Sequence, residues 1–345
     1  MIGYYVHHHG DGHRQRALAI AQAAGGGITL LGTGLTGRTG RIPCVDLPDD
    51  RLTAGSFDGA DHVGRPGSLH YAPLDHEGIR WRVAKIADWI ASARPRLFVV
   101  DVSVEVAMLA RLASVPTVYV RLSGHRTDRP HLDAYQGASA LLAPFHPDLD
   151  DEAVDAVIRG KSFYASGIGA AAAPEHVQTD LVVGVVGRGG QPSDGALWAE
   201  AARAVPNRRW RVIGPCTAPR DTPPNLELRG WVNDADRHIA SAGVVVGAGG
   251  DGLVASVIAN RRPFICIPER RPFDEQHCKA RRLSHLGAAI VSPDWPASPQ
   301  WPAMIERVEA LDPAALAGLH DRDGAAKAAQ WLVAMAATPI RQPSA

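Results

Sequence analysis

The chain has 345 residues, and its 36 Lys and Arg residues balance 36 Asp and Glu residues, so the formal net charge is zero. That length suits two domains or one large one, and the zero balance argues against a nucleic-acid binder that works through bulk positive charge. No apolar run approaches the ~18 residues of a membrane-spanning helix, the N-terminus is too polar for a signal peptide, and the four cysteines lack the C-x-x-C spacing of a zinc site or disulfide framework, so we expect a soluble, cytoplasmic protein.

Short apolar runs alternate with longer amphipathic ones through the first half of the chain. In chain order the pattern predicts a strand (2–6), a helix (13–24), two strands (28–31 and 69–72), a helix (77–93), a strand (97–100), a helix (105–113) and a strand (117–120). Most of these strands lack polar alternation. They are therefore expected to be buried on both faces, as in a parallel sheet covered by helices.

The pattern stops between residues 166 and 179, where Gly, Ala and one Pro follow no period. It then predicts a strand (181–186), a helix (196–204), two strands (210–213 and 226–229), a helix (235–242), a strand (244–246), a helix (253–260), a strand (264–267), a helix (275–286) and a strand (289–291). We predict two α/β domains with doubly wound parallel sheets, at residues 1–168 and 180–337, with a linker at 169–179 and a tail at 338–345.

Three of the predicted strands run into a glycine-rich turn and then a helix. The turns are GDGH at residues 10–13, GRGG at 187–190 and GAGGDG at 247–252. Glycine lets backbone N–H groups approach a ligand, and the N-terminus of the following helix favours an anion. One such turn alone indicates only a tight connection, but three together favour an anion site. Neither of the first two is a Walker A loop or a complete G-x-G-x-x-G, and no convincing acidic residue lies ~20 positions on at the end of a second strand, so a nicotinamide enzyme is a weak alternative.

The segment from residue 230 to residue 291 resembles a known family. It carries G-W-V-x-D, a helix, A-x-x-V-V-x-x-G-G, P-x-x-x-I-P and an acidic/Gln pair before a further helix, in that order. This order is similar to the donor-binding domain of GT-B glycosyltransferases, most of all the family 28 group, which includes the peptidoglycan N-acetylglucosaminyltransferase and the diacylglycerol galactosyltransferases. The strand, G-x-G-H and helix at residues 10–13 are a second likeness. The resemblance implies two Rossmann-like domains facing each other across a cleft.

In such enzymes the second domain holds a nucleotide-sugar and the first holds the acceptor. The resemblance, with the preference of helix N-termini for anions, implies a nucleotide and diphosphate site made of Gly12, Gly187, Arg188, Gly189, Gly190, Trp231, Val232, Gly249, Gly250 and Ser256. It implies a donor-sugar site at Asp274, Glu275 and Gln276, although Asp274 is also a good start for a helix.

Two positions depart from the family pattern. Ser256 stands where family 28 enzymes usually have a ribose-binding Glu, and Ala248 stands where many plant-type enzymes have a His. UDP is the expected donor nucleotide, with dTDP and GDP as alternatives.

His13 is the candidate general base, because it occupies the G-H position to which the resemblance assigns that role. Inversion at an anomeric carbon needs a base to take the acceptor hydroxyl's proton, and an imidazole, with an ordinary pKa of ~6.5, suits that task at neutral pH. Asp101 matches the strand-end Asp that orients the imidazole in plant-type enzymes, with a cap for the following helix as the alternative. Glu105 is a weaker substitute for it.

The run His7, His8 and His9 also suggests a metal site beside His13. Alternation along a strand sends His7 and His9 to one face and His8 to the other, so these side chains do not converge easily. We therefore expect no metal and no cofactor, with the UDP-sugar as co-substrate.

The sequence predicts an inverting, metal-independent glycosyltransferase that moves a hexose or N-acetylhexosamine from a UDP-sugar to an acceptor hydroxyl. The acceptor is a lipid carrier, a glycan or a small natural product, bound by loops near residues 35–68 and 122–131. Alternatives are a nucleotide-sugar 2-epimerase or hydrolase of the same fold, or a non-catalytic nucleotide-sugar-binding subunit. We expect no nucleic-acid partner and at most peripheral membrane contact, with the paired arginines forming solvated faces.

Overall fold

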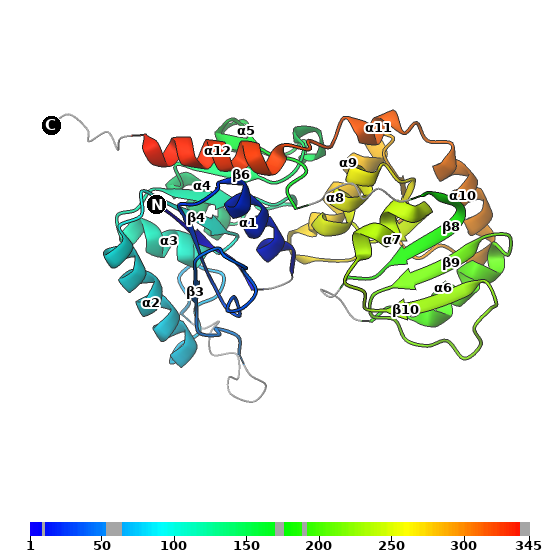
Figure 1. Ribbon diagram of the computed structural model, residues 1–345, viewed down its shortest axis with the longest axis horizontal. Helices are drawn as coiled ribbons and strands as arrows, with labels where there is room; N and C mark the ends of the chain where they lie inside the picture. The colour runs from blue at the N-terminus through cyan, green and yellow to red at the C-terminus, as the bar shows by residue number, and fades with distance from the viewer. Residues whose placement is uncertain (9–10, 53–63, 170–175, 188–191, 339–345) are drawn as a thin grey trace.

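Two parallel β-sheets organise the chain, one in each half (Figure 1). The computed structural model describes residues 1–8, 11–52, 64–169, 176–187 and 192–338. Among these residues the first sheet has seven strands in the order β3-β2-β1-β4-β5-β6-β7, and the second has six in the order β10-β9-β8-β11-β12-β13. Neighbouring strands in both sheets are parallel. The predicted pair of doubly wound α/β domains is confirmed.

The elements that build the first sheet and its helices are β1 (Ile2–Tyr5), α1 (Asp11–Ala23), β2 (Ile28–Gly32), β3 (Cys44–Asp46), α2 (Glu77–Ala93), β4 (Leu97–Asp101), α3 (Val104–Leu112), β5 (Thr117–Val120), α4 (Arg129–Gly137), β6 (Ala140–Ala143), α5 (Ala156–Lys161) and β7 (Ser162–Tyr164). Those that follow are β8 (Gln178–Val185), α6 (Gly195–Ala204), β9 (Arg209–Ile213), β10 (Leu226–Gly230), α7 (Ala235–Ser241), β11 (Ala242–Gly247), α8 (Asp251–Asn260), β12 (Phe264–Cys266), α9 (Glu275–His285), β13 (Ile290–Val291), α10 (Trp301–Glu309), α11 (Ala314–Ala317) and α12 (Gly324–Ala337).

Each sheet is buried on both faces. Tyr4 of β1 lies in the apolar core that includes α1, whereas Tyr5 beside it lies in the core that includes α2 and α3. Val99 and Val100 of β4 divide between the same two cores. Successive side chains of a strand point to opposite faces, which is why these strands are apolar throughout.

The order of strands reverses once in each sheet, between β1 and β4 and between β8 and β11. In open α/β sheets such a reversal leaves room for a ligand beside the carboxyl ends of the two central strands. The three predicted glycine turns follow β1, β8 and β11. In both domains the glycine turns therefore lie where a sheet of this topology is expected to bind a ligand.

The predicted strand at residues 69–72 is wrong. The backbone N–H groups of His70 and Tyr71 donate to the carboxylate of Glu105, both at 2.8 Å, and not to a neighbouring strand. The edge of the first sheet is instead β3, which is three residues long and only partly buried. An edge strand that short carries no periodic signal.

The last helix corrects the predicted domain boundaries, which assign residues 180–337 to the second domain. Helix α12 packs on the first domain beside α1 (Figure 1). Ala328, Ala329 and Leu332 lie in the same core as β1, and Trp331 stacks on Phe163 of β7 with ring centroids 4.5 Å apart. Helix α12 therefore belongs to the first domain, although the chain reaches it only after the second.

Replacing Leu332 by alanine should destabilise the first domain, because its side chain is fully buried between α12 and the sheet. A cavity of that size costs about 2–5 kcal/mol of the free energy of unfolding, which denaturant titration measures. Val333 is the matched control, since it is 46% exposed on the same helix; Val333→Ala should change stability by less than ~0.5 kcal/mol. Equal effects of the two variants would contradict the packing of α12.

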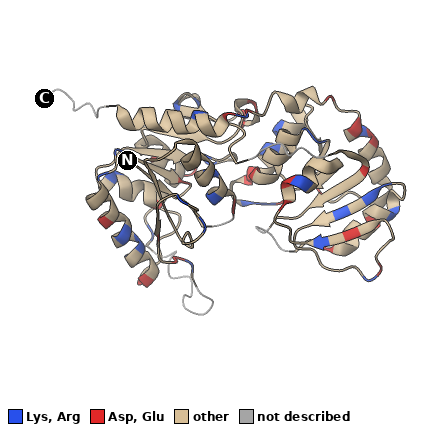
Figure 2. Cartoon of the chain, in the orientation of Figure 1, with Lys and Arg blue, Asp and Glu red and all other residues tan. Residues whose placement is uncertain are grey.

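Acidic and basic side chains are interspersed over both domains (Figure 2). On β8, β9 and β10 of the second sheet, Arg209 pairs with Asp180, and Arg211 and Arg229 both pair with Glu227. This pairing fits arginines that lie on a solvated face. No helix in the described ranges has both the length and the apolar character needed to cross a bilayer.

Candidate active site

The carboxyl ends of β1 and β4 bring His13 and Asp101 together. His13 is the third residue of α1, which begins at Asp11, and Asp101 is the last residue of β4. His13 Nδ1 lies 2.9 Å from Asp101 Oδ1, although the residues are 88 positions apart in the sequence. The Asp101 side chain is fully buried, whereas the His13 side chain is 15% exposed. The structure therefore pairs the two predicted catalytic residues and leaves part of the imidazole accessible.

Arg16, which the sequence analysis missed, completes this group. It lies one turn after His13 on α1 and is 7% exposed. Its Nη2 donates to both carboxylate oxygens of Asp101 at 3.0 Å. Burial by itself raises the pKa of Asp101, but the charge of Arg16 and the hydrogen bond from His13 lower it below its usual value. Asp101 is thus kept as a carboxylate inside the protein.

The ionised carboxylate determines which nitrogen of His13 carries the hydrogen. Nη2 of Arg16 and Nδ1 of His13 lie 2.9 Å apart, and both face Asp101. A carboxylate only accepts hydrogen bonds, so we assign the hydrogen to Nδ1, which donates to Asp101. Nε2 then carries the lone pair. This is the tautomer that a general base requires.

Asp101 does not cap the helix that follows it. The N-cap of α3 is Ser103, whose hydroxyl accepts from the backbone N–H of Val106. Glu105, the weaker substitute for Asp101, does not orient His13. It accepts hydrogen bonds from the backbone N–H groups of His70 and Tyr71 instead. Of the two carboxylates considered, only Asp101 contacts the imidazole.

The N-terminal histidines follow the end of β1 and do not alternate as in a strand, because the rings of His7 and His8 lie 5.0 Å apart. The ring of His7 lies against His13, with centroids 5.4 Å apart, while His8 Nε2 lies 3.3 Å from Asp50 Oδ1. His9 and Gly10 lie outside the described residues. Hence His8 is directed to Asp50 and not to His13.

The glycine turn after β11 presents the N-terminus of α8. Gly250 is the N-cap residue. Because glycine has no side chain, no capping side chain accepts a hydrogen bond from the N–H groups of the first turn. A Cβ on Gly249 would lie 3.0 Å from the backbone oxygen of Gln276, so glycine permits the close approach of α9. Gly12 is inside the first turn of α1, and Gly187 is exposed after β8. The predicted residues Arg188, Gly189 and Gly190 lie outside the described part of the chain.

Asp251 and Lys279 form an ion pair at the start of α8, and both were missed as site residues. Lys279 is 3% exposed. Burial raises the pKa of Asp251, but Lys279, together with Arg16 and His13 of the first domain, lowers it to about 2. The start of α8 is thus coupled electrostatically to Arg16 and His13 of the first domain.

The three predicted sugar-binding residues begin α9. Gln276 is 5% exposed, and its Oε1 accepts from the backbone N–H of Glu269. Glu275 Oε2 accepts from Arg126 Nη2 of the first domain at 3.0 Å. Burial and the carboxylate of Asp251 raise the pKa of Glu275 above its usual value, although nearby cations oppose the shift. Asp274 instead pairs with His277 and Arg281.

Phe273 and Asp274 both have left-handed backbone, with φ of +61° and +54°. This conformation is unfavourable for residues other than glycine, and each such residue costs about 1–3 kcal/mol unless its surroundings impose it. The contacts around residues 273–274 therefore hold this segment in its left-handed conformation.

The remaining predicted nucleotide residues lie in or beside α7 and α8. Trp231 follows β10 and is 49% exposed, while Val232 packs against the core of the second domain. Helix α8 begins two residues earlier than predicted, so Ser256 is in its second turn. Its hydroxyl is buried and donates to Asp236 of α7 at 2.6 Å.

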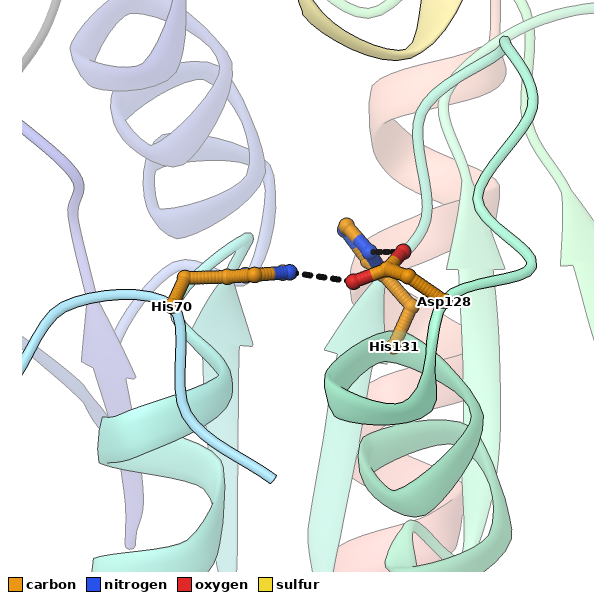
Figure 3. A group of neighbouring side chains, drawn as sticks. All are labelled: His70, Asp128 and His131. Atoms are coloured by element: carbon orange, nitrogen blue, oxygen red, sulfur yellow. Dashed lines mark hydrogen bonds and ion pairs between the residues drawn. The ribbon is translucent and has the colours of Figure 1, made fainter. Parts of the chain in front are cut away.

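A second histidine cluster lies at the end of the first domain that faces α9. Asp128 Oδ2 lies 2.5 Å from His70 Nε2, and Asp128 Oδ1 lies 2.5 Å from His131 Nδ1 (Figure 3). Burial lowers the pKa of His131 to about 4, with Arg126 adding to the effect and Asp128 opposing it. His131 is therefore neutral near pH 7.

Ligand atoms within 4.8 Å of one another occur in three groups of described residues: His70, Asp128 and His131; His125, Asp151 and Cys278; and His8, Asp49 and Asp50. In the first group, Arg126 Nη1 lies 3.2 Å from His131 Nε2, which places a fixed cation beside the imidazole. In the second, Arg281 Nη2 lies 3.1 Å from Cys278 Sγ. Each of these two groups is better described as a network of hydrogen bonds and ion pairs than as a metal centre.

Comparison with known proteins shows the fold. No protein-family model matches the sequence, and no curated protein matches it. The kitacinnamycin glycotransferase has 15% sequence identity, with 97% of this chain and 98% of that chain covered and a TM-score of 0.70. MurG of Acinetobacter baumannii has 16% identity over 95% and 94% of the two chains, with a TM-score of 0.56. The spinosyn rhamnosyltransferase SpnG, in complex with thymidine diphosphate, has 18% identity over 97% and 96%, with a TM-score of 0.59. The chain therefore has the GT-B fold, as the resemblance implied.

Proposed function

We propose that the protein is a metal-independent, inverting glycosyltransferase that acts in the cytoplasm. It would transfer a hexose or N-acetylhexosamine from a nucleotide-sugar to an acceptor hydroxyl. The observation that best supports this proposal is the hydrogen bond between His13 and Asp101, at the carboxyl ends of β1 and β4. The structurally similar glycosyltransferases give independent support for a transferase.

The proposed reaction assigns one role to each member of the catalytic group. His13 Nε2 takes the proton of the acceptor hydroxyl as the acceptor oxygen bonds to the anomeric carbon. The bond from that carbon to the diphosphate breaks, and its electron pair leaves with the nucleoside diphosphate. Attack from the side opposite the leaving group inverts the anomeric centre. Asp101 accepts the Nδ1 hydrogen bond throughout and stabilises the imidazolium that forms.

The leaving diphosphate needs positive potential, and α8 supplies it without a metal. The first N–H groups of α8 have no partner within the helix, and the helix dipole favours an anion at this end. Lys279 adds a buried ammonium group at the same place. Glu275 and Gln276, next to this helix end, are the proposed contacts to the donor sugar. UDP is the proposed nucleotide. The alternative is dTDP, which is supported by the complex of SpnG with thymidine diphosphate.

Replacing Lys279 by methionine should weaken the binding of UDP at least ~10-fold, because a hydrogen bond to a charged group contributes about 1.5–3 kcal/mol. Isothermal titration calorimetry measures this affinity. Lys327→Met is the matched control, because Lys327 lies on the surface and pairs with Asp321 of the connection before α12. Unchanged UDP affinity in Lys279→Met would remove Lys279 from the proposed diphosphate site.

The assay that tests the function measures nucleotide release from UDP-, dTDP- and GDP-sugars, with and without a panel of lipid-carrier, glycan and natural-product acceptors. A transferase releases nucleotide faster when the right acceptor is present. Full turnover without any acceptor would replace the proposal with a hydrolase or 2-epimerase. Nucleotide binding without turnover under any condition would replace it with a non-catalytic subunit, and absence of binding to all three nucleotides would exclude all of these functions.

A further inference from the structure

Phe273 of the second domain docks on a surface of the first. Its ring centroid lies 4.6 Å from that of His131 and 5.6 Å from that of His70. The guanidinium of Arg126 lies 4.7 Å from the centre of the same ring, within range of a cation–π contact. The side chain of one domain is therefore surrounded by three side chains of the other.

The receiving surface is held rigidly. Asp128 fixes both imidazoles by hydrogen bonds, and Figure 3 shows its carboxylate joined to His70 and to His131. Glu105 fixes the backbone of His70. His131 is almost fully buried and lies on α4. The rings that receive Phe273 thus have little freedom to follow it.

The backbone takes part in the same contact. The N–H of His125 donates to the carbonyl oxygen of Phe273 at 2.6 Å. Gly124 has φ of +107°, and a Cβ there would lie 2.5 Å from the Phe273 oxygen and 2.9 Å from the Cα of Glu275. Only glycine permits this approach. The first domain therefore presents a loop shaped for residues 273–275.

We propose that Phe273 is a positioning residue that couples closure of the domains to assembly of the sugar site. Its docking imposes the strained left-handed turn at Phe273 and Asp274 and brings Glu275 to Arg126. When the domains separate, the turn loses the contacts that hold it, and Glu275 and Gln276 lose their place relative to His13. This inference rests on the proposed function, because it assigns the sugar contacts to the residues that follow Phe273.

The test compares Phe273→Ala and Gly124→Ala with Phe273→Tyr, which keeps the ring. Turnover number and donor KM are measured for each, together with UDP affinity and the radius of gyration from small-angle X-ray scattering. Both alanine variants should lower turnover about 100-fold, as a misplacement near 1 Å does. They should bind UDP within ~3-fold of the unaltered protein and have a larger radius of gyration, because the two domains separate. Phe273→Tyr should keep most of the turnover.

Scattering needs no substrate, so it separates this inference from the proposed function. Domain opening in both alanine variants of a protein that transfers no sugar would leave the docking intact and overturn only the function. An active protein whose alanine variants keep full turnover and the original radius of gyration would overturn the docking role. Arg282→Gln is the matched control, because Arg282 also joins the domains, at Asp148 and Glu152, away from Phe273; an equal loss of turnover in Arg282→Gln would also overturn it.

Discussion

Replacement of His13 by alanine is expected to lower turnover by about 10²–10⁴-fold, the usual contribution of a positioned general base. The acceptor hydroxyl then has no group to receive its proton, because Asp101 is fully buried behind the imidazole. Binding of UDP should change little, since the proposed diphosphate site is on the second domain. Steady-state kinetics and calorimetry on the same preparation measure the two effects separately.

A control distinguishes loss of the base from loss of any histidine. His285 lies in the last turn of α9 and is exposed, so His285→Ala should keep full turnover. Normal activity in His13→Ala would overturn the assignment of the base, and loss of nucleotide binding would show that His13 acts on the donor instead.

The second large effect is expected for Asp101→Asn, in both activity and stability. An Asn carries no charge to match Arg16, and an unpaired buried charge costs about 3–5 kcal/mol of the free energy of unfolding. The amide can also present its N–H₂ to Nδ1, which favours the wrong tautomer of His13. In serine proteases the equivalent change lowers turnover about 10⁴-fold. Thermal unfolding and steady-state kinetics measure the two losses.

The double variant Arg16→Met with Asp101→Asn separates the two losses. It removes the unpaired cation, so it should recover most of the lost stability. Activity should remain as low as in Asp101→Asn, because Nδ1 still lacks a carboxylate. Recovery of activity together with stability would mean that Asp101 serves the fold alone.

The fold was predictable from local patterns, whereas much of the site was not. Uninterrupted apolar strands indicated two parallel sheets, and the glycine turns fell beside the reversals of strand order. The burial of Arg16 could not be predicted, because its partner Asp101 is 85 positions away in the sequence. An Arg on an amphipathic helix is ordinarily expected to face solvent. Lys279 was missed for the same reason, since its burial depends on the approach of α8 to α9.

The pairing of His13 with Asp101 was reached only through resemblance to a family. Local patterns gave no hint that His70 joins Asp128, because that contact depends on how Glu105 holds the loop before α2. The partner of Ser256 was equally hidden, as it depends on the packing of α7 against α8.

The return of α12 to the first domain determines how the two domains are able to move. The chain crosses between them twice, once between β7 and β8 and once between α11 and α12. The two crossings lie against each other, since a Cβ on Gly167 would lie 2.1 Å from the backbone oxygen of Asp321, and one on Gly324 would lie 1.7 Å from that of Ser166. The second domain is thus a contiguous insertion in the first, and the two segments of chain that join it to the first domain form one compact connection. Any relative motion of the domains is therefore expected to bend both segments together.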